Sequence, residues 1–118
     1  TSVKIPLKNP GVSNTIRGAV ASWAKTMANE LGQYNITVNN VLPGFTNTQR
    51  LSTLVKNIAT REGKKVEEVE AHMQTEVPMK RFGEASEIAA VAAFLASPAA
   101  SYVNGVSIPV DGGRTGSV

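Results

Sequence analysis

Residues 13–48 read SNTIRGAVASWAKTMANELGQYNITVNNVLPGFTNT, and this stretch decides the fold of the 118-residue chain. Apolar residues recur every three or four positions from Ile16 to Leu31, which predicts one long amphipathic helix. After a short turn, the β-branched run Ile36–Leu42 predicts a buried strand. In open α/β sheets, ligands bind at loops that leave the carboxyl ends of strands. The loop 43–48 is therefore the first place to look for a binding site.

The predicted helix presents two kinds of surface. Its large apolar residues share one face and its small residues lie elsewhere on the cylinder, where a second helix could approach closely, so we expect burial on both sides. Ser13 or Asn14 is expected to cap the start, because a short side-chain oxygen accepts a hydrogen bond from an unpaired backbone amide. Gly32 is expected to take the left-handed conformation that closes helices. The large face comprises Ile16, Ala19, Val20, Trp23, Met27 and Leu31, and the small residues are Gly18, Ala21, Ser22 and Ala28.

The rest of the chain alternates further helices with one more strand. Residues 46–80 are polar and predict two short helices over a cleft, an arrangement that can act as a mobile lid. The alanine-rich run from Ala85 predicts another helix, and residues 105–111 predict a short strand that Pro109 places at a sheet edge. A strand, helix and strand in succession imply a parallel pair with a right-handed crossover. Because two parallel strands need cover and neighbours, the chain is either the distal half of a larger doubly wound sheet or is completed by another chain.

Composition argues against several classes of function. The chain has no cysteine and one histidine, so we expect no disulfide and no bound metal. Its 12 Lys plus Arg exceed its 9 Asp plus Glu, but they are scattered and only 5% of residues are aromatic, so a nucleic-acid surface is not expected. No apolar run is long enough to span a membrane and no signal peptide is visible, so we expect a cytoplasmic protein.

Two segments of the sequence, ELGQYNITVNNVLPGFTNT (30–48) and RFGEASEIAAVAAFLASPAASYVNGVSIPVDGG (81–113), resemble parts of a known family. The first is similar to the strand and cofactor loop of the short-chain dehydrogenases/reductases, in particular 3-oxoacyl-carrier-protein reductases, and the second to their carboxyl-terminal signature. The resemblance implies an α/β fold in which residues 1–118 are the carboxyl-terminal half of one NAD(P)-binding domain, a Rossmann-type doubly wound parallel sheet. The glycine-rich turn that holds the dinucleotide phosphates would precede Thr1, since no G-x-G-x-x-G follows a strand here.

The resemblance places Ser13 and Arg17 at two catalytic positions. Members of the family carry a Tyr and, four residues later, a Lys at the start of the long helix, where the ammonium lowers the pKa of the phenol so that it exchanges a proton with the substrate oxygen. Ser13 is a far weaker acid than a phenol. Arg17 keeps its charge and could hold the ribose hydroxyls of the cofactor, but it would not shuttle protons. The alternatives are a helix cap for Ser13 and a structural salt bridge for Arg17. Ser2 lies near the position of the family's catalytic serine without matching it.

The loop after the first strand is the stronger candidate for a cofactor contact. In the family, a Pro-Gly-x-x-x-Thr loop contacts the nicotinamide carboxamide and the pyrophosphate, and the resemblance assigns this role to Pro43, Gly44, Phe45, Thr46 and Thr48. A glycine permits close approach of the backbone to a ligand, and a hydroxyl can bond to an anionic oxygen. The alternative is a turn closed by its own side chains.

The resemblance implies an oxidoreductase that uses NADP or NAD to pass a hydride between the nicotinamide and a carbonyl or alcohol substrate, of the 3-oxoacyl type in the narrowest interpretation. We expect a homodimer or homotetramer. The alternative is a noncatalytic dinucleotide-binding or oligomerisation module, because the Tyr and Lys positions hold Ser13 and Arg17. Whether the chain is part of an enzyme is therefore left open by the sequence.

Other polar residues are expected to be structural. Tyr34 lies roughly 25 Å from Arg17 along the helix axis, too far to replace the missing phenol. Asn39 is expected to tie the strand to a loop, and His72 to be solvated. The basic pairs at 64–65 and 80–81 fit a solvated face better than a docking site for a phosphate-bearing acyl carrier.

Overall fold

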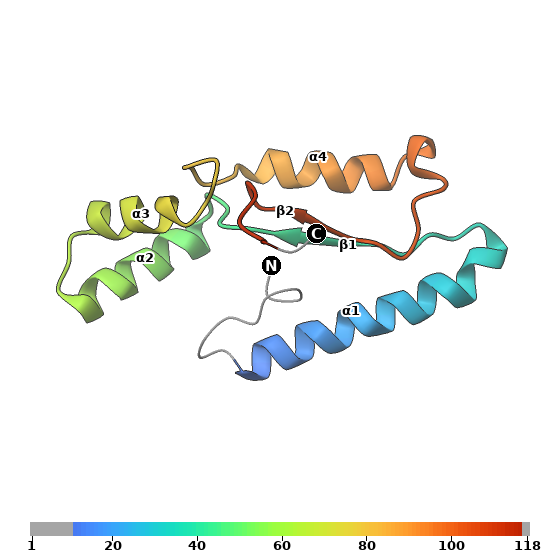
Figure 1. Ribbon diagram of the computed structural model, residues 1–118, viewed down its shortest axis with the longest axis horizontal. Coiled ribbons are helices and arrows are strands. Elements are labelled where there is room, and N and C mark those ends of the chain that lie inside the picture. Colours follow the sequence, from blue (N-terminus) through green and yellow to red (C-terminus); the bar gives the residue numbers. More distant parts are fainter. Residues whose placement is uncertain (1–10, 117–118) are drawn as a thin grey trace.

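Figure 1 shows the computed structural model, which describes residues 11–116. A short pair of strands lies at its centre, with α4 on one side of the pair, α1 on the other, and α2 and α3 beyond one end. Predictions for residues 1–10, including Ser2, fall outside the described residues. In chain order the elements are α1 (Gly11–Leu31), η1 (Gly32–Tyr34), β1 (Asn40–Pro43), α2 (Gln49–Glu62), α3 (Val66–Thr75), α4 (Ala85–Leu95), η2 (Pro98–Ala100) and β2 (Ser107–Val110).

The two strands run parallel, with Asn40 opposite Ser107 and Pro43 opposite Val110. This confirms the α/β fold with a parallel strand pair that the sequence predicts. Within residues 11–116 each strand pairs on one side only, and such an edge tolerates the missing amide of Pro109. Helix α4 packs against both strands, so one face of the pair is covered by an apolar helix.

Strand β1 is shorter than the predicted run Ile36–Leu42. Its amino-terminal part is held by the loop before β2 through both backbone and side-chain bonds. The Gly105 amide donates to the Val38 carbonyl at 2.9 Å, and the Asn40 amide donates to the Val106 carbonyl at 2.8 Å. The amide of Val38 donates to Asn104 Oδ1 at 2.9 Å, and Asn39 Nδ2 donates to the Val103 carbonyl at 2.8 Å. Asn39 Oδ1 in turn accepts from the amide of Val106 at 3.1 Å. Asn39 therefore ties strand to loop, as the sequence predicts.

Both ends of α1 differ from the prediction. The described residues are helical from Gly11 on, so Ser13 and Asn14 lie inside the helix and neither is its N-cap. At the other end, Gly32 does not take the left-handed conformation, because the chain continues into the 3₁₀ turn η1. Asn35 takes that conformation instead, at φ 58°, and its amide donates to the Gly32 carbonyl.

Helix α1 is buried on one side, whereas the sequence predicts burial on both. Ala28 is buried, as predicted, together with Ala24, whereas Ile16, Ala19, Val20 and Trp23 of the large apolar face are exposed and Met27 and Leu31 are half-buried. The loop before β2 approaches α1 closely: Asn104 Nδ2 donates to the Ala28 carbonyl at 2.9 Å, and an added Cβ at Gly105 would lie 3.3 Å from Ala28 Cβ. So short a separation leaves room only for small side chains. The exposed large side chains include Ile16 (58% exposed), Val20 (51%) and Trp23 (62%).

Helices α2 and α3 confirm the prediction of two short helices within 46–80, and they pack on each other. Their facing sides form a small core of their own, with Phe45, Ile58, Val66 and Phe82 at its border. Leu54 is 44% exposed, although it shares the helical spacing of its neighbours. The buried members of this core are Leu51, Val55, Ala59, Val69 and Met73.

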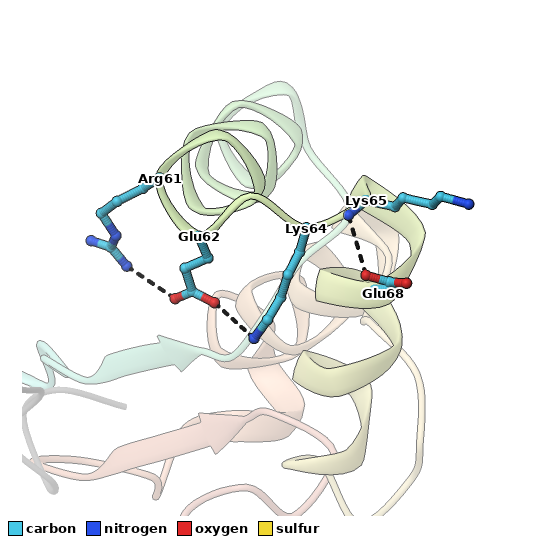
Figure 2. A network of polar contacts seen from close by, with 5 residues as sticks. All are labelled: Arg61, Glu62, Lys64, Lys65 and Glu68. Atoms are coloured by element: carbon cyan, nitrogen blue, oxygen red, sulfur yellow. Dashed lines mark hydrogen bonds and ion pairs between the residues drawn. The ribbon is translucent and has the colours of Figure 1, made fainter.

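The turn between α2 and α3 is closed by polar contacts (Figure 2). Gly63 takes the left-handed conformation at φ 64° and ends α2. Glu62 lies between two cations, accepting from Lys64 Nζ at 3.0 Å and from Arg61 at 3.5 Å, while Glu68 accepts from the amide of Lys65 at 3.3 Å. Lys64 is therefore paired locally, which favours the solvated-face interpretation over a docking site.

Candidate functional site

Ser13 and Arg17 lie one turn apart near the start of α1. Arg17 Nε donates to Ser13 Oγ at 3.2 Å, and the guanidinium is exposed. In Figure 1 the start of α1 lies toward the same end of the molecule as the carboxyl ends of β1 and β2. No hydrogen bond within residues 11–116 joins this pair to the loop 43–48. The structure brings the two side chains together, with Ser13 half-buried and Arg17 exposed.

The loop 43–48 leaves the carboxyl end of β1 and is held by backbone contacts on two sides. The amide of Gly44 donates to the Val110 carbonyl at 3.0 Å. Further along, Gly83 donates to the Phe45 carbonyl at 2.9 Å, and Asn47 donates to the Gly83 carbonyl at 2.8 Å. The amides of Phe45 and Thr46 have no acceptor in the described part of the chain. Two adjacent donors are therefore free to bind a ligand.

The threonine hydroxyls of this loop bond weakly within it. Thr46 Oγ1 donates to the Gly44 carbonyl at 3.2 Å, and Thr48 Oγ1 donates to the Thr46 carbonyl at 3.3 Å. Thr48 is also the N-cap of α2, since its Oγ1 accepts from the amide of Leu51 at 3.4 Å. Bonds this long are near the limit of hydrogen bonding, so a stronger acceptor could replace them. Both predicted roles, turn closure and ligand contact, remain compatible with this geometry.

Gly44 is required by its neighbour on the second strand. An added Cβ at this position would lie 2.6 Å from Asp111 Cβ and 2.7 Å from Asp111 Cα. Such distances are well inside van der Waals contact, and the backbone of Asp111 cannot rotate away. The glycine therefore permits β1 and the end of β2 to meet at this edge.

Three residues that lie beside the loop, Phe82, Asp111 and Arg114, were not predicted as site residues from the sequence. The Phe82 ring packs edge-on against the Phe45 ring with centroids 6.0 Å apart, and the Arg114 guanidinium lies 4.0 Å from the centre of the Phe45 ring. Asp111 follows β2 directly. The carboxyl ends of neighbouring parallel strands meet at one edge, so the Val-Asp-Gly-Gly ending of the second predicted strand was the signal that could have placed Asp111 beside Gly44.

Asp111 organises the turn after β2. Its carboxylate accepts from the amide of Gly113 at 3.0 Å, from the amide of Thr115 at 2.9 Å and from Thr115 Oγ1 at 2.6 Å. Burial, the largest single effect, raises the pKa of the Asp111 carboxyl, but the bonds from Thr115 and Gly113 outweigh it, so the pKa is lowered. Asp111 is therefore ionised at neutral pH.

An open cavity of about 330 Å³ lies between this turn, the loop 43–48 and the start of α4. Arg81 and Glu87 line it as a two-pronged ion pair, with both Arg81 Nη atoms 2.7 Å from Glu87 oxygens. The hydrogen bond from Arg81 and the one from the Glu84 amide lower the pKa of Glu87 to about 2. Arg81 is thus paired, and no residue of α2 or α3 lines this cavity, so the lid role of those helices stays a prediction.

The remaining polar residues lie away from this edge. Tyr34 is exposed in η1 at the far end of α1, and His72 is exposed on α3. Among residues 11–116 no three His, Asp or Glu side chains gather as a metal site would require. Within the same residues, none of the helices combines the length and the apolar character needed to cross a bilayer.

Comparison with known proteins decides the family. A family model described as "Enoyl-(Acyl carrier protein) reductase" matches residues 1–115. The chain belongs to the short-chain dehydrogenase/reductase family. Among short-chain dehydrogenases/reductases, the NADPH-dependent reductase BacG of Bacillus subtilis (strain 168) is 37% identical over 115 residues, which cover 98% of this chain and 44% of BacG. The 3-oxoacyl-(acyl-carrier-protein) reductase FabG of Staphylococcus epidermidis is 36% identical over 115 residues, covering 96% of this chain and 43% of FabG.

Solved structures agree with this assignment. The short chain dehydrogenase family protein of Francisella tularensis subsp. tularensis SCHU S4 superposes with a TM-score of 0.93 at 31% identity, over 98% of this chain and 48% of that one. YwfH, described as an NADPH dependent reductase involved in bacilysin biosynthesis, superposes with a TM-score of 0.92 at 37% identity, over 100% of this chain and 45% of YwfH. The resemblance stated from residues 30–48 and 81–113 and the Rossmann-type fold class are confirmed. The chain spans less than half the length of these relatives.

Proposed function

We propose that this chain forms the nicotinamide side of an NADP(H)-dependent oxidoreductase that interconverts a carbonyl and an alcohol. The observation that carries the proposal is the loop 43–48, where the amides of Phe45 and Thr46 have no acceptor within residues 11–116. Adjacent amide donors beside threonine hydroxyls fit a carboxamide oxygen and phosphate oxygens. Relatives named as NADPH-dependent reductases support NADP(H) as the cofactor rather than NAD(H).

Ser13 and Arg17 act at the substrate oxygen in this proposal. When bound, the cofactor supplies or accepts the hydride. Because Arg17 Nε donates to Ser13 Oγ at 3.2 Å, the hydroxyl proton is free to donate to a substrate oxygen. The nearby positive charge stabilises the alkoxide that forms as hydride reaches the carbonyl carbon. The proton that neutralises the alkoxide comes from solvent, since neither side chain releases one as readily as a phenol.

A noncatalytic dinucleotide-binding or oligomerisation module is the second candidate. It is favoured by the same two residues, because the serine and arginine pair with each other and lack the acid that the family's Tyr and Lys provide. In this case the loop 43–48 would bind the cofactor without turnover. Binding and turnover therefore have to be measured separately.

The test compares the natural full-length protein with Ser13→Ala and with Ser13→Tyr combined with Arg17→Lys. NADPH oxidation is followed with a panel of ketones, including 3-oxoacyl thioesters, and NADPH binding is measured by fluorescence. Ser13→Ala is expected to lower kcat by about a hundredfold, the loss that follows removal of one hydrogen-bond donor to a developing oxyanion, and to leave NADPH binding unchanged. Thr15→Ala is the control, because the Thr15 hydroxyl bonds to the Gly11 carbonyl of its own helix.

Two results would contradict the enzyme proposal. One is a natural protein that binds NADPH without turning over any substrate, while the double variant gains activity; the noncatalytic module would then be correct. The other is a natural protein that binds no dinucleotide. A kcat unaffected by Ser13→Ala would remove Ser13 from the mechanism and leave the cofactor loop standing.

The assembly and the substrate are also proposals. We propose a homodimer or homotetramer, and the exposed apolar residues of α1 support this assembly. We also propose that the protein is cytoplasmic. A 3-oxoacyl substrate is supported by the similarity to FabG. The lid offers little to an acyl chain, because Leu51 is buried in the core of α2 and α3 and Ile58 packs against it, which leaves Leu54 as the exposed member of that group.

A further inference from the structure

The turn after β2, residues 111–115, packs between the segment that leaves α3 and the loop 43–48 of the proposed site. The Asp111 carboxylate fixes it internally, and Gly112 and Gly113 adopt φ values of 64° and 86° that suit glycine. The Gly112 carbonyl accepts from the amide of Met79 at 3.2 Å, and a Cβ on Gly113 would lie 3.2 Å from the Pro78 ring. The turn is therefore packed tightly against the segment that leaves α3.

The same turn contacts the proposed cofactor loop. Gly44 lies directly against the backbone of Asp111, as the 2.7 Å distance from its missing Cβ position to Asp111 Cα shows. The next loop residue, Phe45, is covered by Arg114, whose guanidinium lies 4.0 Å from the ring centre. Gly44 and Phe45, which precede the free amide of Thr46, are thus both held in place by the turn 111–115.

Arg114 joins three segments at once. Its Nη2 forms an ion pair with Glu76 Oε2 at 2.8 Å, just after α3, while its plane covers Phe45 of the loop. Its side chain is only 19% exposed, against 72% for Arg61 in the ion pair at the far end of α2. A partly buried, charge-assisted bond combined with a cation–π contact holds a side chain more firmly than an exposed surface pair does.

We propose that Arg114 is a positioning residue for the cofactor loop. By clamping Phe45 against the turn 111–115 and anchoring the clamp to Glu76, it fixes the direction of the Phe45 and Thr46 amides before the cofactor arrives. A preorganised loop binds without the cost of ordering it. The inference rests on the proposed function of the loop 43–48. It adds a residue outside the Pro-Gly-x-x-x-Thr segment that holds this loop in place.

The experiment uses the full-length protein and measures KM and kcat for NADPH together with amide hydrogen exchange of residues 44–48 without cofactor. Arg114→Ala is expected to raise KM for NADPH about tenfold, in line with loss of a cation–π contact and a charged hydrogen bond, while kcat changes little. The loop amides should exchange faster. Arg114→Lys keeps the charge for Glu76 but lacks a planar group, so it should restore part of the loss.

Two further variants guard against a purely structural effect. Glu76→Gln removes the ion pair and leaves the stacking on Phe45, so it should give a smaller rise in KM than Arg114→Ala. Arg61→Ala removes an arginine paired to a glutamate away from the loop, and it should change neither KM nor loop exchange. Thermal melting of each variant identifies any that is unfolded. If Arg114→Ala is unfolded, the KM values of Arg114→Lys and Glu76→Gln test the positioning role instead.

Each outcome is distinct. If the natural protein binds NADPH but the Arg114 variants keep its KM and its loop exchange, the positioning role is overturned and the proposed function stands. If kcat and KM fall or rise together in all variants including Arg61→Ala, the effect is global stability and the positioning role is also overturned. If the natural protein binds no NADP(H), the proposed function fails first and the positioning role with it.

Discussion

Thr48 has two roles, capping α2 and, in the proposed site, binding the cofactor. Substitution by alanine removes both roles, so a second variant is needed to separate them. Its Oγ1 caps α2 by accepting from the amide of Leu51, and the proposed site uses the same hydroxyl to donate to the cofactor. Thr48→Ala is expected to cost about 1 kcal/mol of unfolding free energy through the lost cap. It should also weaken NADPH binding about tenfold, the value of one hydrogen bond to a charged acceptor.

Thr48→Asn separates the two roles, because asparagine is an even better N-cap but places its polar atoms differently. We expect urea denaturation to show restored stability, while fluorescence titration shows that NADPH binding stays weak. Thr53→Ala serves as the control, since Thr53 bonds only to the Gln49 carbonyl within α2. If Thr48→Asn binds NADPH as the natural protein does, Thr48 is a cap and nothing more.

At the scale of an element, the start of α4 depends on Glu87. The hydrogen bond from Arg81 and the one from the Glu84 amide lower its pKa from 4.5 to about 2 in the folded protein. A carboxyl whose pKa is depressed on folding stabilises the protein fully above its unfolded pKa and loses that contribution as pH falls through the folded value. The contribution should therefore be complete above about pH 4.5 and decline toward pH 2.

Glu87→Gln is expected to lower the melting temperature of the full-length protein at neutral pH, and the difference from the natural protein should shrink as pH falls through this window. Gln at this position still accepts the Glu84 amide, so the lost charge is the variable tested. Glu67→Gln removes the same charge from the first turn of α3, where no ion pair occurs within residues 11–116. A pH-independent difference for Glu87→Gln would mean that the pairing with Arg81 adds no stability.

The elements that the sequence predicts well are those decided by local pattern. Helical spacing located α1, α2, α3 and α4, and β-branched composition located β1. The limits of these elements depend on contacts that the patterns do not show. The Val38 carbonyl accepts from the Gly105 backbone amide, but the Val38 amide is taken by the Asn104 side chain, far along the chain, so the strand begins only at Asn40. Gly32 is not left-handed because an added 3₁₀ turn moves that conformation to Asn35.

The candidate site was predictable to the same extent. The loop 43–48 follows from a strand that ends in Pro-Gly, whereas Ser13 and Arg17 were assigned through the family resemblance; their spacing of four residues predicts only that they share one face of the helix. Arg114 could not be found in this way, because its role depends on a ring and a carboxylate in two other segments. For α1, the sequence predicts close packing at Ala28 but not its partner, which is the loop at Gly105 rather than a second helix.

At the scale of the whole molecule, the chain is extended and leaves an apolar face open. Its radius of gyration is 16.3 Å, against about 13.5 Å for a compact domain of this length. Trp23 is 62% exposed in the middle of the uncovered face of α1, with Ile16 and Val20 on the same side. An aromatic side chain of this size is seldom left in water when its neighbours are also apolar.

We therefore expect a second copy of the protein to cover Trp23. Trp23→Glu places a charge in that contact, and burying an unpaired charge is costly enough to separate the copies. Light scattering should show a smaller species for Trp23→Glu than for the natural full-length protein, and a blue-shifted tryptophan emission should mark the natural assembly. Trp23→Phe, which keeps an apolar ring, should assemble normally. Gln33→Glu adds the same charge at an exposed position in η1, beyond the far end of α1, and should leave the mass unchanged. A Trp23→Glu protein that stays folded at the natural mass would show that the face of α1 is covered within one copy.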